Sequence, residues 1–300
     1  MTAAPEALEI MHTPQATRSR LGIIAGGGSL PQAVAEAARE GGHSPFIIGL
    51  SGNAAAGIER FPHAYAGIGQ TGRVLRILRQ EGCKRIVLVG SLRRPSLFRL
   101  RIDAGLIRYL PELLRLIRGG GDDAVLRGVA RFFEARGFEV VAAHDVAPRL
   151  LAPPGTFSAA APDADSLSDM RLGFRVARSL GAFDIGQGAV VSRQYVLAVE
   201  AAEGTDAMLR RCRDLNNWGV KAGKARKGVL VKAPKPGQDL RIDLPAIGPD
   251  TVQLASEAGL AGIAVAAGAV LLANQQELVE KADRFGLFLY GASSADVMGS

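Results

Sequence analysis

The first half of the chain alternates between short apolar runs and longer segments with helical periodicity. The apolar runs predict strands at residues 21–25, 46–50, 65–69, 85–90 and 138–143. The segments between them predict helices at residues 31–39, 71–81, 103–118 and 122–136, and Pro111 allows a break in the third of these. Strands that alternate with helices form a parallel sheet covered on both faces. We therefore expect an α/β fold that begins with a doubly wound, Rossmann-like domain.

Proline and glycine interrupt this alternation close to residue 150, at Pro148, Pro153, Pro154 and Gly155. Beyond that point helices are predicted at residues 163–180, 205–216, 251–258 and 275–285. Strands are predicted at residues 188–191, 195–201, 228–232, 239–244 and 287–290, with two short apolar strands before the last helix. We therefore expect a disordered extension at residues 1–20, an N-terminal domain at 21–150 and a mixed α/β C-terminal domain at 151–295.

No segment has the pattern of a signal peptide or a membrane span. Residues 1–20 contain two prolines and no sustained apolar core, and translation from Met11 is an alternative start. The longest apolar run, residues 260–273, falls short of the ~20 residues that cross a bilayer. We expect a cytoplasmic protein, with contact to a membrane surface left open.

The composition narrows the candidate chemistry. Four His and two Cys in 300 residues disfavour a zinc site built from Cys and a His-rich two-metal phosphoesterase. The net charge of +7 favours an anionic partner, which is phosphate, nucleic acid or a membrane surface. Aromatic residues make up only 5% and no nucleic-acid motif is present, so we expect no nucleic-acid partner.

A basic stretch lies at residues 92–118. It holds seven Arg against two acidic residues, with apolar residues interleaved among them. Such an amphipathic stretch suits an anionic membrane or a lipid. The alternative is a solvated helix face whose long Arg side chains cover apolar surface.

A glycine-rich turn, Gly26-Gly27-Gly28-Ser29, links the first predicted strand to the first helix. A turn of this kind directs backbone N–H groups and the positive end of the helix dipole at an anion. Pro31 stands where the dinucleotide-binding fingerprint has its third glycine, so that fingerprint is not met. The alternative is a tight strand-to-helix turn with no ligand.

At three further places in the chain, polar residues have either a functional or a structural interpretation. Asp122 and Asp123 follow three glycines, where adjacent carboxylates suit a hydrated Mg²⁺ or, alternatively, cap the next helix. Thr205 and Asp206 begin another predicted helix and either bind ribose or phosphate or cap that helix. His144 ends a predicted strand at the ligand-binding edge of the sheet, where a structural role is the simpler interpretation.

The densest cluster of chemistry-bearing residues lies at residues 229–251. Pro234 and Pro236 hold Lys235 on an extended backbone, and three carboxylates follow, at Asp239, Asp243 and Asp250. On a strand, Arg241 and Asp243 would share one face. A cation beside an acid that acts as a base or metal ligand is the minimum for pyrophosphate hydrolysis, and the alternative is a solvated surface loop.

Long motifs then carry a family resemblance. They are GIIAGGGSLP (22–31), GGDDAVLR (120–127), AHDV (143–146), DIGQGAVV (184–191), EGTDAMLRR (203–211), KAPKPGQDLRIDLPAIG (232–248) and GLAGI (259–263). In this order they resemble the LpxI family of UDP-2,3-diacylglucosamine hydrolases of lipid A biosynthesis, from about residue 21 to residue 292.

The resemblance implies Mg²⁺-dependent cleavage of the pyrophosphate of UDP-2,3-diacylglucosamine, giving UMP and 2,3-diacylglucosamine 1-phosphate (lipid X). It implies a lipid held between two domains, a homodimer, and water attack on the phosphorus nearer the sugar. The family's essential aspartate falls on Asp243, which would act on the water or bind Mg²⁺, with Asp122 or Asp123 completing the metal shell. Lys232 and Lys235 would offset the pyrophosphate charge. The remaining substrate contacts would come from Gly26, Gly27, Gly28, Ser29, Gln187, Thr205 and Asp206.

Two alternatives stay open at the level of sequence. The first is a non-catalytic carrier of a nucleotide sugar or glycolipid that uses the same cleft. The second is a nicotinamide-dependent oxidoreductase built on the strand, glycine-rich turn and helix, against which Pro31 argues.

Overall fold

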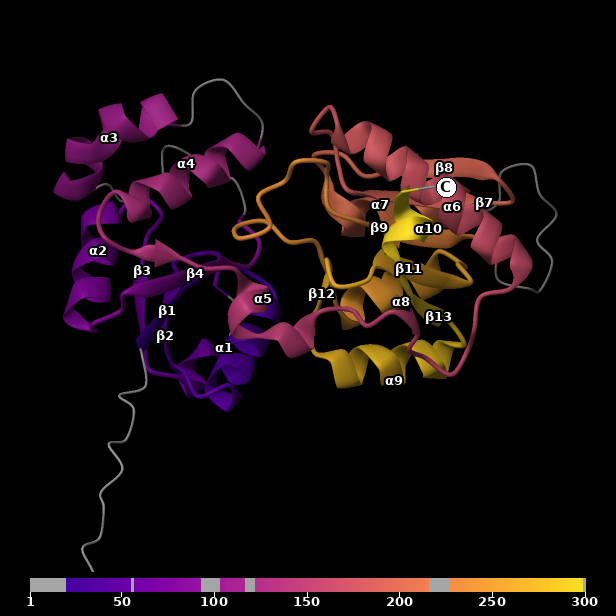
Figure 1. The fold of residues 1–300 in the computed structure, drawn as a ribbon, viewed down its shortest axis with the longest axis horizontal. Coiled ribbons are helices and arrows are strands. Elements are labelled where there is room, and N and C mark those ends of the chain that lie inside the picture. Colours follow the sequence, from indigo (N-terminus) through magenta and orange to yellow (C-terminus); the bar gives the residue numbers. More distant parts are fainter. Residues whose placement is uncertain (1–19, 55–56, 93–102, 117–121, 216–226, 299–300) are drawn as a thin grey trace, which may run out of the picture.

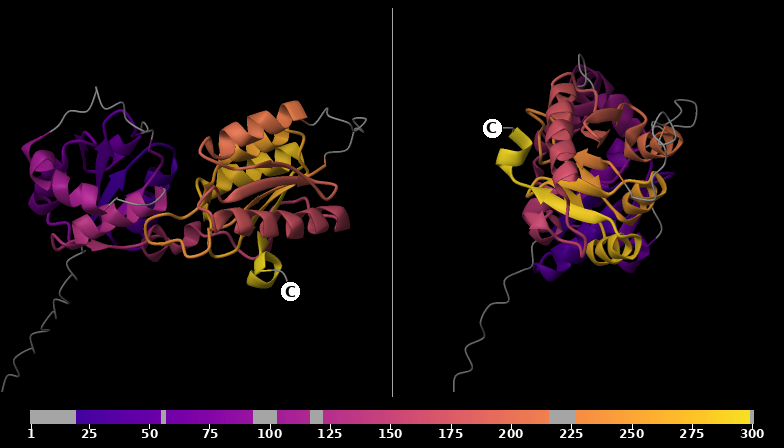
Figure 2. Two further views of the ribbon diagram at one scale, coloured as in Figure 1. Left: turned by 90° about the horizontal axis from the view of Figure 1, so that it is seen from above. Right: turned by 90° about the vertical axis from the view of Figure 1, so that its right-hand side faces the viewer.

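The computed structural model describes residues 20–54, 57–92, 103–116, 122–215 and 227–298. The expected extension, apart from residue 20, and residues 93–102 of the basic stretch lie outside these ranges. The chain forms two α/β lobes that lie side by side, the N-terminal lobe in indigo and magenta and the C-terminal lobe in orange and yellow (Figures 1 and 2). Each lobe is built around its own sheet.

The N-terminal lobe contains a five-stranded parallel sheet with the order β3-β2-β1-β4-β5. Its strands are β1 (Arg20–Ala25), β2 (Ser44–Leu50), β3 (His63–Ala66), β4 (Arg85–Val89) and β5 (Glu139–Val140). The central strand β1 pairs with β2 through Ile23 and Ile47 and with β4 through Ile23 and Val87. The predicted α/β class with a doubly wound N-terminal sheet is confirmed.

Helices cover both faces of this sheet. Ile23 faces the cluster that contains α1 (Leu30–Glu40), α5 (Ala143–Val146) and the 3-10 turn η3 (Pro148–Leu150), whereas Ile24 faces the opposite cluster. That second cluster contains buried residues of α2 (Thr71–Gln80) and α4 (Asp122–Glu134), and α3 (Ala104–Leu116) packs beside both helices. A short 3-10 turn, η1 (Ile58–Arg60), precedes β3. Alternate residues of a strand point to opposite faces, which explains the nearly continuous apolar run of β1.

The C-terminal lobe contains a six-stranded mixed sheet with the order β6-β13-β11-β9-β7-β8. The three parallel strands β9 (Val229–Lys232), β11 (Gly262–Ala266) and β13 (Phe288–Ala292) form its centre. The antiparallel hairpin of β7 (Gly188–Ser192) and β8 (Tyr195–Val199) extends one side, and β6 (Gly155–Thr156) adds an antiparallel strand on the other.

Helices also cover both faces of this second sheet. On one face lies α6 (Ala164–Gly181), whose Gly173 approaches β9 so closely that a Cβ there would lie 2.8 Å from the Val231 methyl groups. The helix α10 (Ser294–Met298) packs against α6. On the other face, α7 (Gly204–Leu215), α8 (Pro249–Glu257) and α9 (Gln275–Phe285) pack side by side, as Figure 2 shows.

Three predicted strands were wrong in extent or kind. The strand expected at residues 239–244 is a turn, because the N–H groups of Ile242 and Asp243 both donate to the Asp239 carbonyl. The strand expected at 138–143 ends at Val140, and the chain turns into α5 where Asp145 accepts the Ala142 N–H. The third strand is His63–Ala66 rather than 65–69.

Pro111 does not break its helix. It lies inside α3, which continues to Leu116. Proline leaves the carbonyl four residues earlier without its helical donor. That carbonyl belongs to Ile107. Since Ile107 is 67% exposed, water can donate a hydrogen bond to its carbonyl oxygen.

A long loop joins the lobes in addition to the chain crossing near residue 150. Residues 233–245 leave the end of β9 and extend toward α4, seen as the orange loop between the lobes in Figure 1. Ile242 in this loop is buried in the N-terminal cluster that contains Ile24. The short strands β10 (Ala246–Ile247) and β12 (Leu271–Leu272) form a parallel pair next to it. Among the described helices, none combines the length and hydropathy needed to cross a membrane.

Candidate active site

A buried polar cluster lies at the end of β9. The Lys232 Nζ donates to the Thr205 Oγ1 at 2.5 Å and lies 3.7 Å from the Glu200 Oε1, while the Thr205 hydroxyl donates to the same carboxylate oxygen at 2.8 Å. The Lys232 and Glu200 side chains are only 6% and 9% exposed. Burial of either charge alone would be costly, so the ion pair and the bridging hydroxyl are what make this cluster stable.

The sheet register places these groups together. Lys232 on β9 pairs with Gly188 on β7, and the Glu200 N–H donates to the Gly188 carbonyl from the end of β8. A Cβ on Gly188 would lie 2.7 Å from the Glu200 Oε2. Because Gly188 on the middle strand β7 has no side chain, Lys232 on one side of it and Glu200 on the other can approach each other.

Two acceptors in this cluster have no donor within the described part of the chain. They are the Oε2 of Glu200 and the Oε1 of Gln187, and both atoms are buried. Gln187 precedes β7, and its carbonyl accepts the Ala233 N–H just after Lys232. Buried acceptors without donors are unusual in folded proteins, so this edge of the sheet is suited to a ligand that supplies N–H or O–H groups.

Lys235 lies on the first part of the long loop and is also paired. Its Nζ lies 2.5 Å from the Asp184 carboxylate, and its side chain is 13% exposed. Lys232 and Lys235 thus each have a carboxylate partner. The sequence predicted their cationic character, but it did not identify Glu200 and Asp184 as the acids that balance them.

Gln238 links the two halves of the loop. Its Oε1 accepts the Lys235 N–H at 2.7 Å, and its Nε2 donates to the Asp243 carboxylate. The turn through Pro236 and Gly237 brings these residues together, and Gly237 takes a positive φ of 74° that favours glycine. Gln238 therefore fixes the position of the Asp243 carboxylate relative to the lysine segment.

Asp243 lies at the point where this loop meets the N-terminal lobe. The residue before it, Ile242, is 7% exposed within one apolar cluster of that lobe, and Leu244 after it packs against the other. Arg241 donates to Glu134 on α4 at 2.9 Å and to Asp239 at 2.8 Å. Asp243 is therefore held against the N-terminal lobe, although it follows a strand of the C-terminal lobe.

The Asp239 carboxylate accepts hydrogen bonds from Arg241 within this turn, so its role there is structural. The Arg241 guanidinium bonded to it holds the pKa of the Asp239 carboxyl below its usual range, with a smaller contribution from Arg127 on α4. The expectation that Arg241 and Asp243 share the face of a strand is wrong, because the segment is a turn and the two side chains have different partners.

The glycine-rich turn is packed more tightly than an open phosphate loop. Gly26 donates its N–H to the Val89 carbonyl at 2.9 Å and Gly27 to the Ser91 carbonyl at 2.7 Å. A Cβ at Gly26 would lie 2.5 Å from the Ser91 carbonyl oxygen, so close approach to β4 requires glycine there. Gly28 and Ser29 are exposed at the start of α1. Because the N–H groups of Gly26 and Gly27 are bonded to carbonyls, only those of Gly28 and Ser29 are left in this turn to bind an anion.

The remaining predicted residues fall into two groups. Thr205 joins the buried cluster, whereas Asp206 is exposed one residue further along α7. His144 lies in α5, not at the end of a strand, and Asp250 lies in the first turn of α8. Asp122 and Asp123 begin α4, the helix that holds Arg241, but their side chains lie outside the described part of the structure.

The described residues contain no group of three His, Cys, Asp or Glu that would form a metal cage. Mg²⁺ does not need one, because it is commonly held by one or two carboxylates together with water and phosphate oxygens. The oxygen donors of Asp243 fit that requirement in chemical type. The start of α4, with its two aspartates, belongs to the same helix that Arg241 contacts at Glu134.

Comparisons with known proteins found family matches for both parts of the chain. A profile of the LpxI N-terminal domain matches residues 20–150, and a profile of the LpxI C-terminal domain matches residues 153–290. The chain belongs to the LpxI family. It is also 43% identical over 272 residues to a Caulobacter vibrioides protein named UDP-2,3-diacylglucosamine pyrophosphatase LpxI. The aligned region covers 91% of this chain and 97% of that protein. The resemblance inferred from the motifs is confirmed.

The loop at 233–245 lies within one of the motifs on which the family resemblance rests. The longest of these motifs, residues 232–248, contains the segment that leaves the C-terminal sheet and contacts the N-terminal lobe. Sequence reasoning missed Glu200, Asp184 and Gln238 as partners within the site. Gln238 could have been noticed, since it stands inside that motif between the lysines and Asp243.

Proposed function

We propose that this chain hydrolyses the pyrophosphate bond of UDP-2,3-diacylglucosamine and releases UMP and lipid X. The observation that carries the proposal is the 43% identity across both lobes to a relative named for that activity. The site supports it in kind, since it combines paired lysines, unpartnered buried acceptors and a positioned aspartate.

The buried cluster is proposed to bind the polar part of the substrate. The Lys232 ammonium has three N–H donors, and Thr205 takes one of them in the cluster. A phosphate oxygen is a suitable partner for a remaining donor. The acceptors on Glu200 and Gln187 suit hydroxyl or N–H groups of the sugar or the uracil ring.

Asp243 is proposed to act on the attacking water. Its carboxylate accepts a hydrogen bond from Gln238, which limits its rotation, and its neighbours anchor the backbone in the N-terminal lobe. A carboxylate held in this way can orient a water molecule and accept its proton as the P–O bond forms. We propose that the water attacks the phosphorus nearer the sugar, so that UMP is the leaving group.

Mg²⁺ is proposed as the cofactor, with Asp243 and Asp123 as its protein ligands and Asp122 as an alternative to Asp123. When bound, the ion would offset the negative charge that accumulates on the pyrophosphate oxygens. The lysines alone are insufficient for this purpose, because each already balances a carboxylate. Chelation by EDTA should therefore abolish turnover.

The lipid is proposed to lie between the two lobes. The loop at 233–245 places Asp243 where one lobe meets the other, so a substrate that reaches both Asp243 and Lys232 must extend along this boundary. Burial of acyl chains contributes roughly 0.8 kcal/mol per CH₂ group before ordering costs, which favours retention of lipid X. A homodimer and transient contact with the inner membrane complete the proposal.

The test is incubation of the protein with UDP-2,3-diacylglucosamine in H₂¹⁸O, with and without EDTA. The proposal predicts UMP release that EDTA stops, with the ¹⁸O label in the phosphate of lipid X. Saturable binding without any UMP would contradict it and identify a carrier. Label in UMP would contradict the proposed site of attack.

A further inference from the structure

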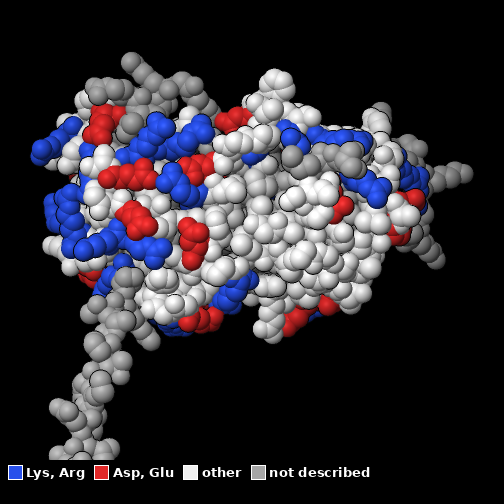
Figure 3. Space-filling model, in the orientation of Figure 1, with Lys and Arg blue, Asp and Glu red and all other residues white. Residues whose placement is uncertain are grey.

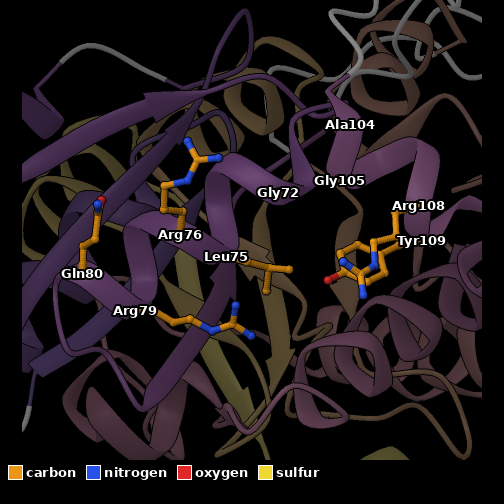
Figure 4. A pocket seen from close by; sticks show the side chains of 9 residues that line it. All are labelled: Gly72, Leu75, Arg76, Arg79, Gln80, Ala104, Gly105, Arg108 and Tyr109. Carbon is orange, nitrogen blue, oxygen red and sulfur yellow. The ribbon is translucent and has the colours of Figure 1, made fainter.

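A groove of about 420 Å³ lies between α2 and α3 on the N-terminal lobe, away from the loop that carries Asp243. Its lining combines apolar and basic side chains, which include Leu75, Arg76 and Arg79 of α2 and Arg108 and Tyr109 of α3. Figure 4 shows Leu75 and Arg79 on α2 extending toward Arg108 and Tyr109 on α3. The groove therefore presents a mixed cationic and apolar surface.

Close packing of two glycines fixes the shape of this groove. A Cβ at Gly72 would lie 3.0 Å from the Gly105 Cα, so α2 and α3 approach each other closely there. Asp103 binds both helix starts, because its carboxylate accepts the Arg73 N–H at 2.9 Å and the Leu106 N–H at 2.7 Å. Gly72 and Gly105 also line the groove, so this joint between the two helix starts forms part of its wall.

The three arginines are available to an external anion. Within the described part of the chain, no carboxylate forms an ion pair with Arg76, Arg79 or Arg108, and the only ring contact of these is Arg108 over Tyr109 at 5.7 Å. All three are exposed. In Figure 3 most of the visible Lys and Arg lie over the N-terminal lobe, with Asp and Glu interspersed among them, whereas much of the visible C-terminal lobe is uncharged. Positive charge without protein partners favours an anionic surface.

Apolar residues project beside this charge. On α3, Ile107 is 67% exposed and Leu110 is 43% exposed. They stand three positions apart and share one exposed face of the helix, whereas Arg108, which follows Ile107 in the sequence, lines the groove. A free phosphate would use the arginines and leave these apolar side chains in water, whereas a lipid headgroup with its acyl chains uses both.

We propose that this groove binds the headgroups of anionic phospholipids and docks the protein on a membrane surface. Arg76, Arg79 and Arg108 contact phosphate, and Ile107 and Leu110 insert among the acyl chains. The inference rests on the proposed function in one respect, since it explains how the enzyme reaches a substrate anchored in a bilayer. The surface is also linked to the site. Glu112 on α3 pairs at 2.7 Å with Arg136, two residues beyond the end of α4, and α4 binds the Asp243 loop through Glu134.

The test is co-sedimentation of the full chain with vesicles of phosphatidylglycerol and phosphatidylcholine, or of phosphatidylcholine alone. The triple variant Arg76→Gln, Arg79→Gln, Arg108→Gln should bind the anionic vesicles more weakly by on the order of a hundredfold. The matched control Arg171→Gln, Arg175→Gln, Arg210→Gln removes three exposed charges from the other lobe and should bind like the wild type. Ile107→Ser with Leu110→Ser should also weaken binding.

Equal binding of both vesicle types, or equal loss in the two triple variants, would overturn the inference. Displacement by inorganic phosphate at the lipid concentration would also overturn it, because it would show a site for soluble anions. UMP release from detergent-dispersed substrate is measured separately. If that release persists while vesicle binding fails, only the docking inference is lost; if vesicle binding holds without UMP release, only the proposed function is lost.

Discussion

The Arg241 guanidinium lies 2.9 Å from the Glu134 carboxylate, and this ion pair joins the loop that carries Asp243 to α4 of the other lobe. The same guanidinium binds Asp239 at 2.8 Å within the loop. Arg241 therefore does two things: it closes the turn before Asp243 and anchors that turn against the N-terminal lobe.

The first prediction is that Arg241→Gln lowers turnover much more than it lowers stability. The Arg241 and Glu134 side chains are 49% and 36% exposed, and exposed pairs contribute about 0–1 kcal/mol to the free energy of unfolding. A displaced Asp243 can nevertheless cost up to about a hundredfold in rate. UMP release and urea denaturation measure the two effects.

Arg149→Gln is the control for this variant. It breaks an ion pair with Glu40 at 2.8 Å, with side chains 52% and 60% exposed, far from the Asp243 loop in sequence. Its turnover should match the wild type. Equal turnover for Arg241→Gln and Arg149→Gln would show that the link to Glu134 plays no part in catalysis.

The second prediction concerns Gln238 as a positioning residue for Asp243. Gln238→Ala should lower kcat with little change in KM, because the Asp243 carboxylate loses a hydrogen bond that helps to limit its rotation. Gln238→Glu should also move the acid limb of the pH–rate profile upward, since a second carboxylate raises the pKa of the first. Gln253→Ala, which removes a 2.8 Å bond to Glu257 on α8, is the control. An unchanged pH profile in Gln238→Glu would argue against this role.

The third prediction separates stability from chemistry in the buried cluster. Lys232→Met leaves Glu200 buried without its cation, so the free energy of unfolding should fall by about 3–5 kcal/mol. The double variant Lys232→Met, Glu200→Leu removes both charges and should recover much of that stability while remaining inactive. Urea denaturation and UMP release test this. Full activity in the folded double variant would mean that the cluster is purely structural.

The fourth prediction follows from Asp103, which anchors the starts of α2 and α3. Burial alone would raise its pKa, but hydrogen bonds from the backbone N–H groups of Leu106, Arg73 and their neighbours outweigh it and hold the pKa below its usual value. A carboxyl with a lowered pKa stabilises the fold above its unfolded pKa of ~3.9, and this contribution is lost as the pH falls through the folded pKa.

Asp103→Ala should therefore destabilise the protein at neutral pH by about 0.5–2 kcal/mol, the usual value of a helix cap. The gap between wild type and variant should narrow once the pH falls below about 4. Urea denaturation at several pH values measures it. A gap that stays constant down to the lowest pH would contradict the role of the ionised carboxylate.

Much of the fold was predictable because each strand of the N-terminal lobe carries a local signal. The run from Leu21 to Ala25 is apolar on both faces, and Pro31 and Gly41 mark the ends of α1. The turn at residues 239–243 carried no such signal. Its residues read as a strand, but the Asp239 carbonyl and the Arg241 side chain provide hydrogen bonds that favour the turn.

The residue types of the candidate site were predicted from the sequence, but their pairings were not. Lys232 and Thr205 were both expected to contact the substrate, and their position beside Glu200 depends on the register of β7, β8 and β9 and on the missing side chain of Gly188. The position of Glu200 beside Lys232 can be recognised only from that register. The glycine-rich turn was predicted as an anion site, and the structure shows that Gly26 also serves close packing against Ser91.

The most direct test of the account is a comparison of Asp243→Asn with Asp250→Asn under single-turnover conditions with UDP-2,3-diacylglucosamine and Mg²⁺. The two variants remove the same charge from the same stretch of sequence, but Asp250 lies in the first turn of α8 rather than in the loop held by Gln238 and Arg241. The account predicts that both variants fold and bind the substrate, and that only Asp243→Asn loses UMP release. Normal UMP release by Asp243→Asn would contradict it.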